Sequence, residues 1–395
     1  MTTAEPAAQR RASRVGTLRR VPTATLLVAL VGALCIVGTV MVGSASEVVA
    51  IDTYGSPWAI LIRQCLWLGV GTIAMVVAIR MDYRVWRRFG RVLLIAAFAG
   101  LLLVLVPHVG AHVTGSTRWL GFGSFDVQPS EIMKFALAVF GADLVVRRED
   151  AGGAERTVMG PLVLTTCAAA GLVLLQPDMG TAVVICWIGF VLLLASGISL
   201  RPLVKVVAGI GLLAVVVGVA DPYRRQRILA FLDPSAHASG SGYQVVQSLI
   251  GLGSGHLFGV GLGSGFEKWG YLPNAQTDFI FSVIGQELGI VGALCVLALL
   301  GALCWFGLRA AQHAPDRFGN LLGVALVTWI GVETLINVGA VIGLLPVTGI
   351  PLPFISYGGS SLVVTMAAAG VVVSIARHER ADARRLVAGR APGAP

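Results

Sequence analysis

Long apolar runs separated by short polar connections dominate the sequence between residues 22 and 376. A predominantly apolar run of about 20 residues is long enough for a helix that crosses a bilayer. About ten such runs are present, at 22–42, 57–79, 91–107, 128–146, 161–176, 181–199, 204–220, 279–306, 320–342 and 359–376. The pattern therefore predicts an all-α integral membrane protein, with one large loop, 221–278, between the seventh and eighth spans.

The composition agrees with this prediction. Hydrophobic residues make up 56% of the chain and charged residues 12%, whereas a soluble domain carries about a quarter charged residues. The net charge of +9 is spread over short connections, so membrane lipids, and not nucleic acid, are the expected anionic partner. The six cysteines lie in apolar runs without CxxC spacing, which indicates neither a zinc site nor a disulfide framework.

Arginine residues gather in alternate connections, which predicts the topology. They follow the even-numbered spans and continue into the C-terminal tail: Arg80, Arg84, Arg87, Arg88, Arg147, Arg148, Arg156, Arg201, Arg309, Arg317, Arg377, Arg380, Arg384 and Arg385. By the positive-inside rule these segments face the cytoplasm. We therefore expect a disordered cytoplasmic tail at 1–21, one membrane domain at 22–376 and a second cytoplasmic tail at 377–395. The loop 221–278 would then be extracytoplasmic.

The stretch KWGYLPNAQTDFIFSVIGQELG, residues 268–289, places Thr277 and Asp278 where the eighth span begins. An ionisable residue at the point where a spanning helix meets water is a candidate functional residue. The alternative is that Thr277 or Asp278 only caps the helix, which contributes about 1 kcal/mol. The residues of this segment alone leave both interpretations open.

Two opposite charges, Glu131 and Lys134, lie inside the fourth span. Their i, i+3 spacing places them on one face of a helix, and a buried pair neutralises much of its own desolvation cost. They form either a structural ion pair or the polar lining of a cavity for an anionic or sugar substrate.

Further polar candidates collect at the predicted outer face. Arg118 precedes the fourth span, Asp178 lies in the turn QPDMGT, and Arg63 is a cation in the second span that can snorkel to the interface. Asp178 is a candidate N-cap as well as a candidate binding residue. The segment 343–361, which contains Ser356, predicts irregular backbone at membrane level. Such backbone is tolerated only where protein or a water-filled cavity surrounds it, which favours a site.

Five motifs occur in a fixed order: RWLGFGSFDVQPSEIMK, QPDMGTA, FLDP with GYQ, GVGLGSGFEKWGYLPNAQTDFIF and GLLPVTGIPLPFISYGGSS. Together they resemble the SEDS family (shape, elongation, division and sporulation) of FtsW, RodA and SpoVE, and the KWGYLP and VMVGSAS runs are most like FtsW. The resemblance covers residues 30–376. It implies a ten-helix peptidoglycan glycosyltransferase that polymerises lipid II at the outer face of the bacterial cytoplasmic membrane. It also implies a class B penicillin-binding protein and other division or elongation proteins as partners.

The resemblance assigns roles to individual residues. The proposed catalytic aspartate of the family corresponds to Asp278, and its acidic and basic pair corresponds to Glu131 and Lys134. The chain departs from the family at Gln276, where histidine is common, and at Gln286, the first position of a later acidic pair. An imidazole at 276 or a carboxylate at 286 therefore has no part in the chemistry here.

Joining two lipid-linked disaccharides requires a base for the acceptor hydroxyl and positive charge for the departing pyrophosphate. Asp278 is the expected general base, and a basic residue or a divalent cation such as Mg or Mn would stabilise the pyrophosphate. The candidate substrate-binding residues are Arg118, Glu131, Lys134, Asp178, Lys268 and Ser356. The alternatives are a lipid II flippase, which would also need a polar cavity, and a non-catalytic scaffold for a partner synthase.

Overall fold

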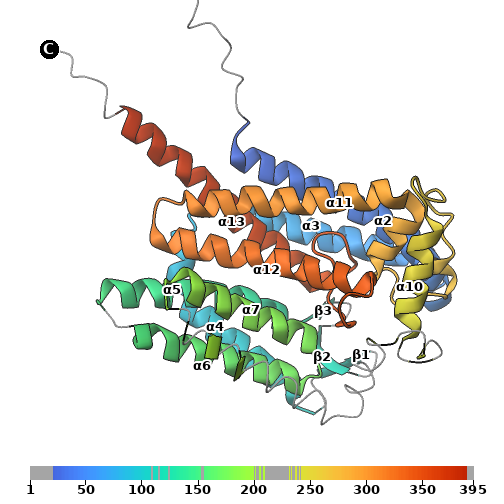
Figure 1. The fold of residues 1–395 in the computed structure, drawn as a ribbon, viewed down its shortest axis with the longest axis horizontal. Helices are drawn as coiled ribbons and strands as arrows, with labels where there is room; N and C mark the ends of the chain where they lie inside the picture. The colour runs from blue at the N-terminus through green and yellow to red at the C-terminus, as the bar shows by residue number, and fades with distance from the viewer. Residues whose placement is uncertain are drawn as a thin grey trace, which may run out of the picture.

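The computed structural model describes residues 21–388, apart from 108–109, 114–115, 123–124, 153–154 and most of 200–241. Long helices form a bundle and run along its length (Figure 1). They are α2 (Thr23–Tyr54), α3 (Ala59–Arg80), α4 (Arg84–Leu105), α5 (Pro129–Asp150), α6 (Glu155–Leu175), α7 (Met179–Ala195), α11 (Ile280–Gln312), α12 (Arg317–Val341) and α13 (Gly359–Ala388).

Seven of the described helices, α2, α3, α4, α6, α11, α12 and α13, are long and apolar enough to cross a membrane, and α7 is a shorter apolar helix. The predicted all-α membrane fold is confirmed. The predicted seventh span, 204–220, and the FLDP motif of the large loop fall mainly outside the described residues.

Two helices, α2 and α13, extend furthest past the ends that the apolar pattern predicts. α2 continues to Tyr54, twelve residues past the predicted end at 42, and stops at Gly55, whose φ of 69° is a left-handed C-cap conformation. The apolar pattern did not predict this extension, because it is interrupted by Ser44, Ser46 and Glu47. Ser46 is nevertheless buried against protein. α13 likewise continues to Ala388, beyond the predicted boundary at 376.

α5 is the central helix that carries the intramembrane charges. Its charged residues keep it below the apolarity of the seven candidate spans, yet most of its first 18 residues are buried. α12 packs against α11 and also against α5 and α7. Glu131, Lys134 and Asp143 of α5 are therefore surrounded by protein and not by lipid, which is the arrangement that charged groups at membrane depth require.

The arginine-rich ends of the helices meet at one end of the bundle. Arg84 pairs with Asp316 at 2.7 Å, and Arg317 pairs with Glu149 at 3.0 Å. These contacts join the start of α4, the end of α5 and the start of α12. The connections that the arginine pattern assigns to the cytoplasm therefore share one side of the protein.

The opposite end holds the short elements (Figure 1). An antiparallel sheet of order β1-β2-β3 is formed by β1 (Gly110–Val113), β2 (Ser116–Phe122) and β3 (Phe125–Val127). The helix α10 (Tyr243–Ser254) and the 3-10 helix η1 (Glu267–Trp269) lie in the connection before α11. The apolar pattern predicted no strand here, because strands this short give almost no periodic signal.

α7 ends at one end of the bundle, and α10, which follows it in the sequence, lies at the other end. Arg317 donates to the Ala195 carbonyl at 2.8 Å, at the arginine-rich end. Ser248 of α10 donates to the Val341 carbonyl at 2.8 Å, at the end that carries the sheet. This placement is the one that a span between them, as predicted at 204–220, requires.

Candidate functional site

Asp278 lies two residues before the start of α11, at the end of the bundle that carries the sheet and α10, and is half-buried. Phe279 occupies the N-cap position of α11 and provides no side-chain cap. The Thr277 hydroxyl donates to the Asn274 carbonyl, at 3.2 Å. The residue at the N-cap position of α11 is therefore neither Thr277 nor Asp278.

Asn337 of α12 holds the backbone at Asp278. Its side-chain amide donates to the carbonyl of Asp278 at 2.8 Å and to the carbonyl of Ile350 at 2.8 Å. The Asp278 carboxylate lies beside Gly349, because a Cβ at that glycine would be 3.6 Å from Asp278 Oδ2. The carboxylate thus faces the 342–358 loop, the segment between α12 and α13.

Ser356 fixes the same segment from the 342–358 loop. Its hydroxyl donates to the Thr277 carbonyl at 2.5 Å and accepts a hydrogen bond from the Leu352 N–H at 2.8 Å. The next residue, Tyr357, donates its backbone N–H to the Gln276 carbonyl at 2.9 Å. Ser356 therefore positions the backbone next to Asp278, and a direct contact with substrate stays a prediction.

The 342–358 loop is irregular backbone, as the sequence predicts. Its second half is enclosed by protein, whereas Leu344 in its first half is 69% exposed. Ile350, Leu352, Phe354 and Ile355 are all buried. α2 comes so close to the loop that a Cβ at Gly38 would lie 2.6 Å from Ile355 Cα. Only glycine permits this approach, and the loop is consequently held between α2 and α12.

The predicted pair of Glu131 and Lys134 forms, and a third charge joins it. Lys134 Nζ lies 2.7 Å from the Glu131 carboxylate and also contacts the Glu333 carboxylate of α12. The ammonium is 5.0 Å from the centre of the Trp329 ring. All three charged side chains are buried. Glu333 lies one helical turn from Asn337, so α12 connects this charged triad to the backbone of Asp278.

Arg118 and Asp178 meet at the start of α7. Arg118 donates to the Pro177 carbonyl at 2.5 Å and lies 3.9 Å from Asp178 Oδ2. Asp178 accepts from the Thr181 N–H at 3.0 Å and from the Gln128 amide at 3.1 Å. The predicted N-cap role of Asp178 is confirmed. Its role in substrate binding, like that of Arg118, stays a prediction.

Lys268 is buried and pairs with Glu47 of α2 at 3.0 Å. Glu47 belongs to the part of α2 that extends past the predicted first span, and sequence reasoning therefore missed this partner. Lys268 lies in η1, and its ion pair with Glu47 joins it to α2 and not to the 342–358 loop.

α11 is broken at Gly289, where φ is 71° and ψ is −172°. In an intact helix the Ile290 N–H would donate to the Gln286 carbonyl. Here the Ile290 N–H donates to the His256 carbonyl at 3.0 Å, and the Gln286 carbonyl accepts from the Val260 N–H at 3.0 Å. The glycine-rich segment 253–265 thus replaces the hydrogen bonds that the break removes, which explains its close packing.

Two further buried carboxylates surround this break and were not among the predicted site residues. Ser44 of α2 donates to the Glu287 carboxylate at 2.7 Å, and Ser282 donates to Glu267 at 2.5 Å. Burial raises the pKa of Glu267 to about 8, and the charge of Glu287 adds to the rise. These groups fix the segment before α11 relative to α2.

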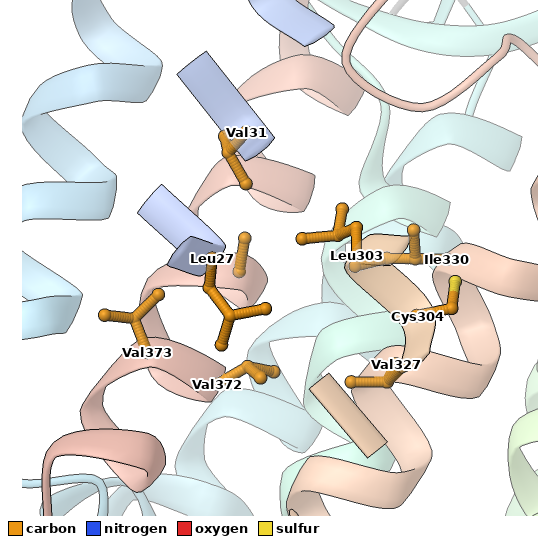
Figure 2. Close-up of a pocket in the computed structure, with 9 residues that line it drawn as sticks. Leu27, Val31, Leu303, Cys304, Val327, Ile330, Val372 and Val373 are labelled. Carbon is orange, nitrogen blue, oxygen red and sulfur yellow. The ribbon is translucent and has the colours of Figure 1, made fainter. Parts of the chain in front are cut away.

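The described residues contain no group of three or more His, Cys, Asp or Glu side chains that could hold a metal ion. The structure therefore assigns no ligands to a divalent cation. A small cavity between α2, α11, α12 and α13 has an apolar lining (Figure 2). Its residues are Leu27, Val31, Leu303, Cys304, Val327, Ile330, Ala369, Val372 and Val373. They offer no charged or hydroxyl group for acid–base chemistry.

The family model for cell cycle proteins of the FtsW, RodA and SpoVE type matches residues 24–381. The chain belongs to this family. It is 39% identical to stage V sporulation protein E of Bacillus subtilis over 357 residues, which are 90% of the chain and 97% of the relative. It is also 39% identical to the probable peptidoglycan glycosyltransferase FtsW of Mycobacterium tuberculosis over 365 residues, 92% of the chain and 70% of the relative.

Solved structures give the same assignment. A chain from the structure titled "Structural coordination of polymerization and crosslinking by a peptidoglycan synthase complex" matches with a TM-score of 0.72 and 30% identity, over 89% of this chain and 97% of that one. RodA of Thermus thermophilus matches with a TM-score of 0.66 and 29% identity, over 89% and 96%. The predicted SEDS membership is confirmed.

In this SEDS protein the predicted residues form three groups. Asp278 and Ser356 are parts of one hydrogen-bonded segment, and the triad around Lys134 reaches that segment through α12. Arg118 and Asp178 form a second group, and Lys268 belongs to a third, with α2. Glu333 was missed, although an acidic residue within the ninth predicted span is the same signal that singled out Glu131.

Proposed function

We propose that the chain is a peptidoglycan glycosyltransferase that polymerises lipid II, with Asp278 as the general base. The observation that carries the proposal is the setting of Asp278. Its carboxylate is half-buried beside an irregular loop, while Asn337 and Ser356 fix the backbone on both sides of it. The FtsW and SpoVE relatives, with matches over most of the chain, support the reaction class.

The chemistry follows from a carboxylate held in this way. Asp278 takes the proton from the acceptor hydroxyl as its oxygen attacks the anomeric carbon of the donor sugar. The bond from that carbon to the pyrophosphate breaks, and the lipid pyrophosphate leaves in a single displacement with inversion. General-base assistance is worth about 10²–10⁴-fold. The rigid backbone at 276–278 contributes by holding the carboxylate in place, since errors at the ångström level are costly.

The cations Lys134, Lys268 and Arg118 serve this site mainly by positioning it. Lys134 is held between two carboxylates, Lys268 by Glu47, and Arg118 by Asp178 and a carbonyl group. The Lys134 ammonium in particular presents no net positive charge to a phosphate, because Glu131 and Glu333 both contact it. We therefore assign the triad to fixing α5 against α12 behind Asp278.

The proposed setting is the outer face of the bacterial cytoplasmic membrane, with both termini in the cytoplasm. The gathering of the arginine-rich ends on one side of the bundle supports this orientation. A class B penicillin-binding protein is the proposed partner, in line with the relative found in a peptidoglycan synthase complex. Relatives named FtsW and SpoVE support a role in division or sporulation.

A polymerisation assay separates this function from the flippase and scaffold alternatives. Purified protein in detergent is incubated with lipid II, with and without a class B penicillin-binding protein whose own reaction is blocked. Glycan strands should form, because detergent removes sidedness and transport then yields no product. Absence of polymer in both reactions, with folded protein, would contradict the proposal.

A further inference from the structure

Arg63 differs from the other basic residues at the end of the bundle that carries Asp278. It lies in the second turn of α3 and is half-buried. The ion pairs found among the described residues engage Arg118, Lys134 and Lys268 but not Arg63. No carboxylate in the part of the chain that the structure describes therefore forms an ion pair with Arg63.

Aromatic hydroxyl groups surround the Arg63 guanidinium instead. It donates to the Tyr54 hydroxyl at 2.9 Å, and its Cζ lies 4.4 Å from the centre of the Tyr54 ring. Tyr357 of the 342–358 loop is also in range: burial raises the pKa of its phenol, and the positive charge of Arg63 counteracts that rise. Two phenols thus frame the guanidinium without cancelling its charge.

Tyr357 connects Arg63 to the backbone next to Asp278. The backbone N–H of Tyr357 donates to the Gln276 carbonyl at 2.9 Å, and Ser356 donates to the Thr277 carbonyl. Arg63 therefore contacts the same short loop that holds the backbone next to the proposed base. The other side faces the membrane, since Tyr54, Trp58 and Ile62 are 46%, 62% and 56% exposed.

We propose that Arg63, framed by Tyr54 and Tyr357, binds the pyrophosphate of a lipid-linked substrate and orients its sugar toward Asp278. The proposal rests on the proposed function, because it takes the substrate class from it. A polyprenyl chain in the membrane places its pyrophosphate at the level of the helix ends. A guanidinium is suited to that group, because its planar donors pair with phosphate oxygens in a bidentate manner.

The Arg63→Gln variant tests the proposal against Arg80→Gln, a matched control at the opposite end of α3 where the side chain is exposed. Polymerisation rates over a range of lipid II concentrations give KM and kcat in phospholipid-free detergent. A hydrogen bond to a charged group contributes about 1.5–3 kcal/mol, which corresponds to at least about a tenfold change in affinity. We expect KM to rise by that factor for Arg63→Gln, kcat to stay within about threefold, and Arg80→Gln to match the parent.

Direct binding of farnesyl pyrophosphate, measured by calorimetry in the same detergent, keeps this test independent of catalysis. The parent and Arg80→Gln should bind it, Arg63→Gln at least about tenfold more weakly, and Arg63→Lys in between. Should Arg63→Gln not fold, Tyr357→Phe takes its place, with a smaller loss of the same sign. A parent that binds the probe but does not polymerise lipid II contradicts the proposed function and leaves the pyrophosphate site supported.

A phospholipid headgroup is the other source of a phosphate for Arg63. Melting temperatures in nanodiscs of phosphatidylcholine and of phosphatidylglycerol, compared with the binding measurement in detergent, distinguish the two. Equal affinity of parent and Arg63→Gln for farnesyl pyrophosphate in detergent, with a lower melting temperature of the variant only in phosphatidylglycerol, would show a membrane anchor and overturn the proposal.

Discussion

Replacement of Lys134 by methionine should be the most destabilising single change among the candidate site residues. The substitution keeps most of the side-chain volume but leaves Glu131 and Glu333 facing each other without a cation. Both carboxylates are buried, and each contacts the ammonium in the parent protein. Removing one partner of a buried ion pair costs about 3–5 kcal/mol, a factor of roughly 10²–10⁴ in the folding equilibrium.

The structure also determines which second change restores stability. The sequence pattern suggests that Glu131→Gln should rescue Lys134→Met, since only those two residues share the helix face. Because Glu333 is the second partner, that double variant still buries one uncompensated carboxylate. The triple variant with Glu333→Gln removes all three charges and should recover most of the stability, whereas the double should recover only part.

Stability is measured as the fraction of purified protein that stays monodisperse after heating in detergent. We expect the order parent, triple, double and then Lys134→Met, from most to least stable. A Lys134→Met variant as stable as the parent would refute the triad, and so would a double variant equal to the triple. A stable triple variant that polymerises normally would remove Glu131 and Lys134 from the candidate substrate-binding residues.

Three further predictions concern the break in α11, a buried acid and the topology. Gly289→Ala should lower the melting temperature and polymerisation, because its Cβ would lie 2.4 Å from the loop backbone at a φ of 71°; unchanged stability would contradict the break. Since the pKa of Glu267 is raised from 4.5 to about 8, folding should weaken as pH rises between those values; Glu267→Gln should flatten that dependence. Cysteines at Ser264 and His313, in a cysteine-free background, should label from outside and inside respectively; the reverse would invert the model of orientation.

Much of the fold could be predicted from the sequence, because spanning helices leave long apolar runs that no other element resembles. The intramembrane pair of Glu131 and Lys134 and the irregular segment around Ser356 were predicted for the same reason: each interrupts an apolar pattern. Asp278 was identified because it lies where the eighth predicted span begins. These signals are local, and the structure confirms the geometry that they imply.

The contacts that could not be predicted join residues far apart in the sequence. Glu333 lies 199 residues from Lys134, and Ser44 lies 243 residues from Glu287. No local spacing indicates which helix faces which in a bundle of many helices. The break at Gly289 was hidden as well, since the hydrogen bonds that replace the helical ones come from the segment 253–265. Gly289, which follows Gln286 and Glu287 in an otherwise apolar run, gives no sign of them.

The rate of lipid II polymerisation by purified Asp278→Asn shows whether Asp278 is the general base. Asparagine has almost the same size and keeps the backbone contacts of Asn337 and Ser356, but its amide does not accept a proton near neutral pH. Asp52→Asn, at an exposed position of α2, is the matched control. We predict normal folding and partner binding for both variants, with a loss of at least about 10²-fold for Asp278→Asn alone and weak activity in Asp278→Glu. Polymerisation by Asp278→Asn at close to the parent rate would show that Asp278 is not the base.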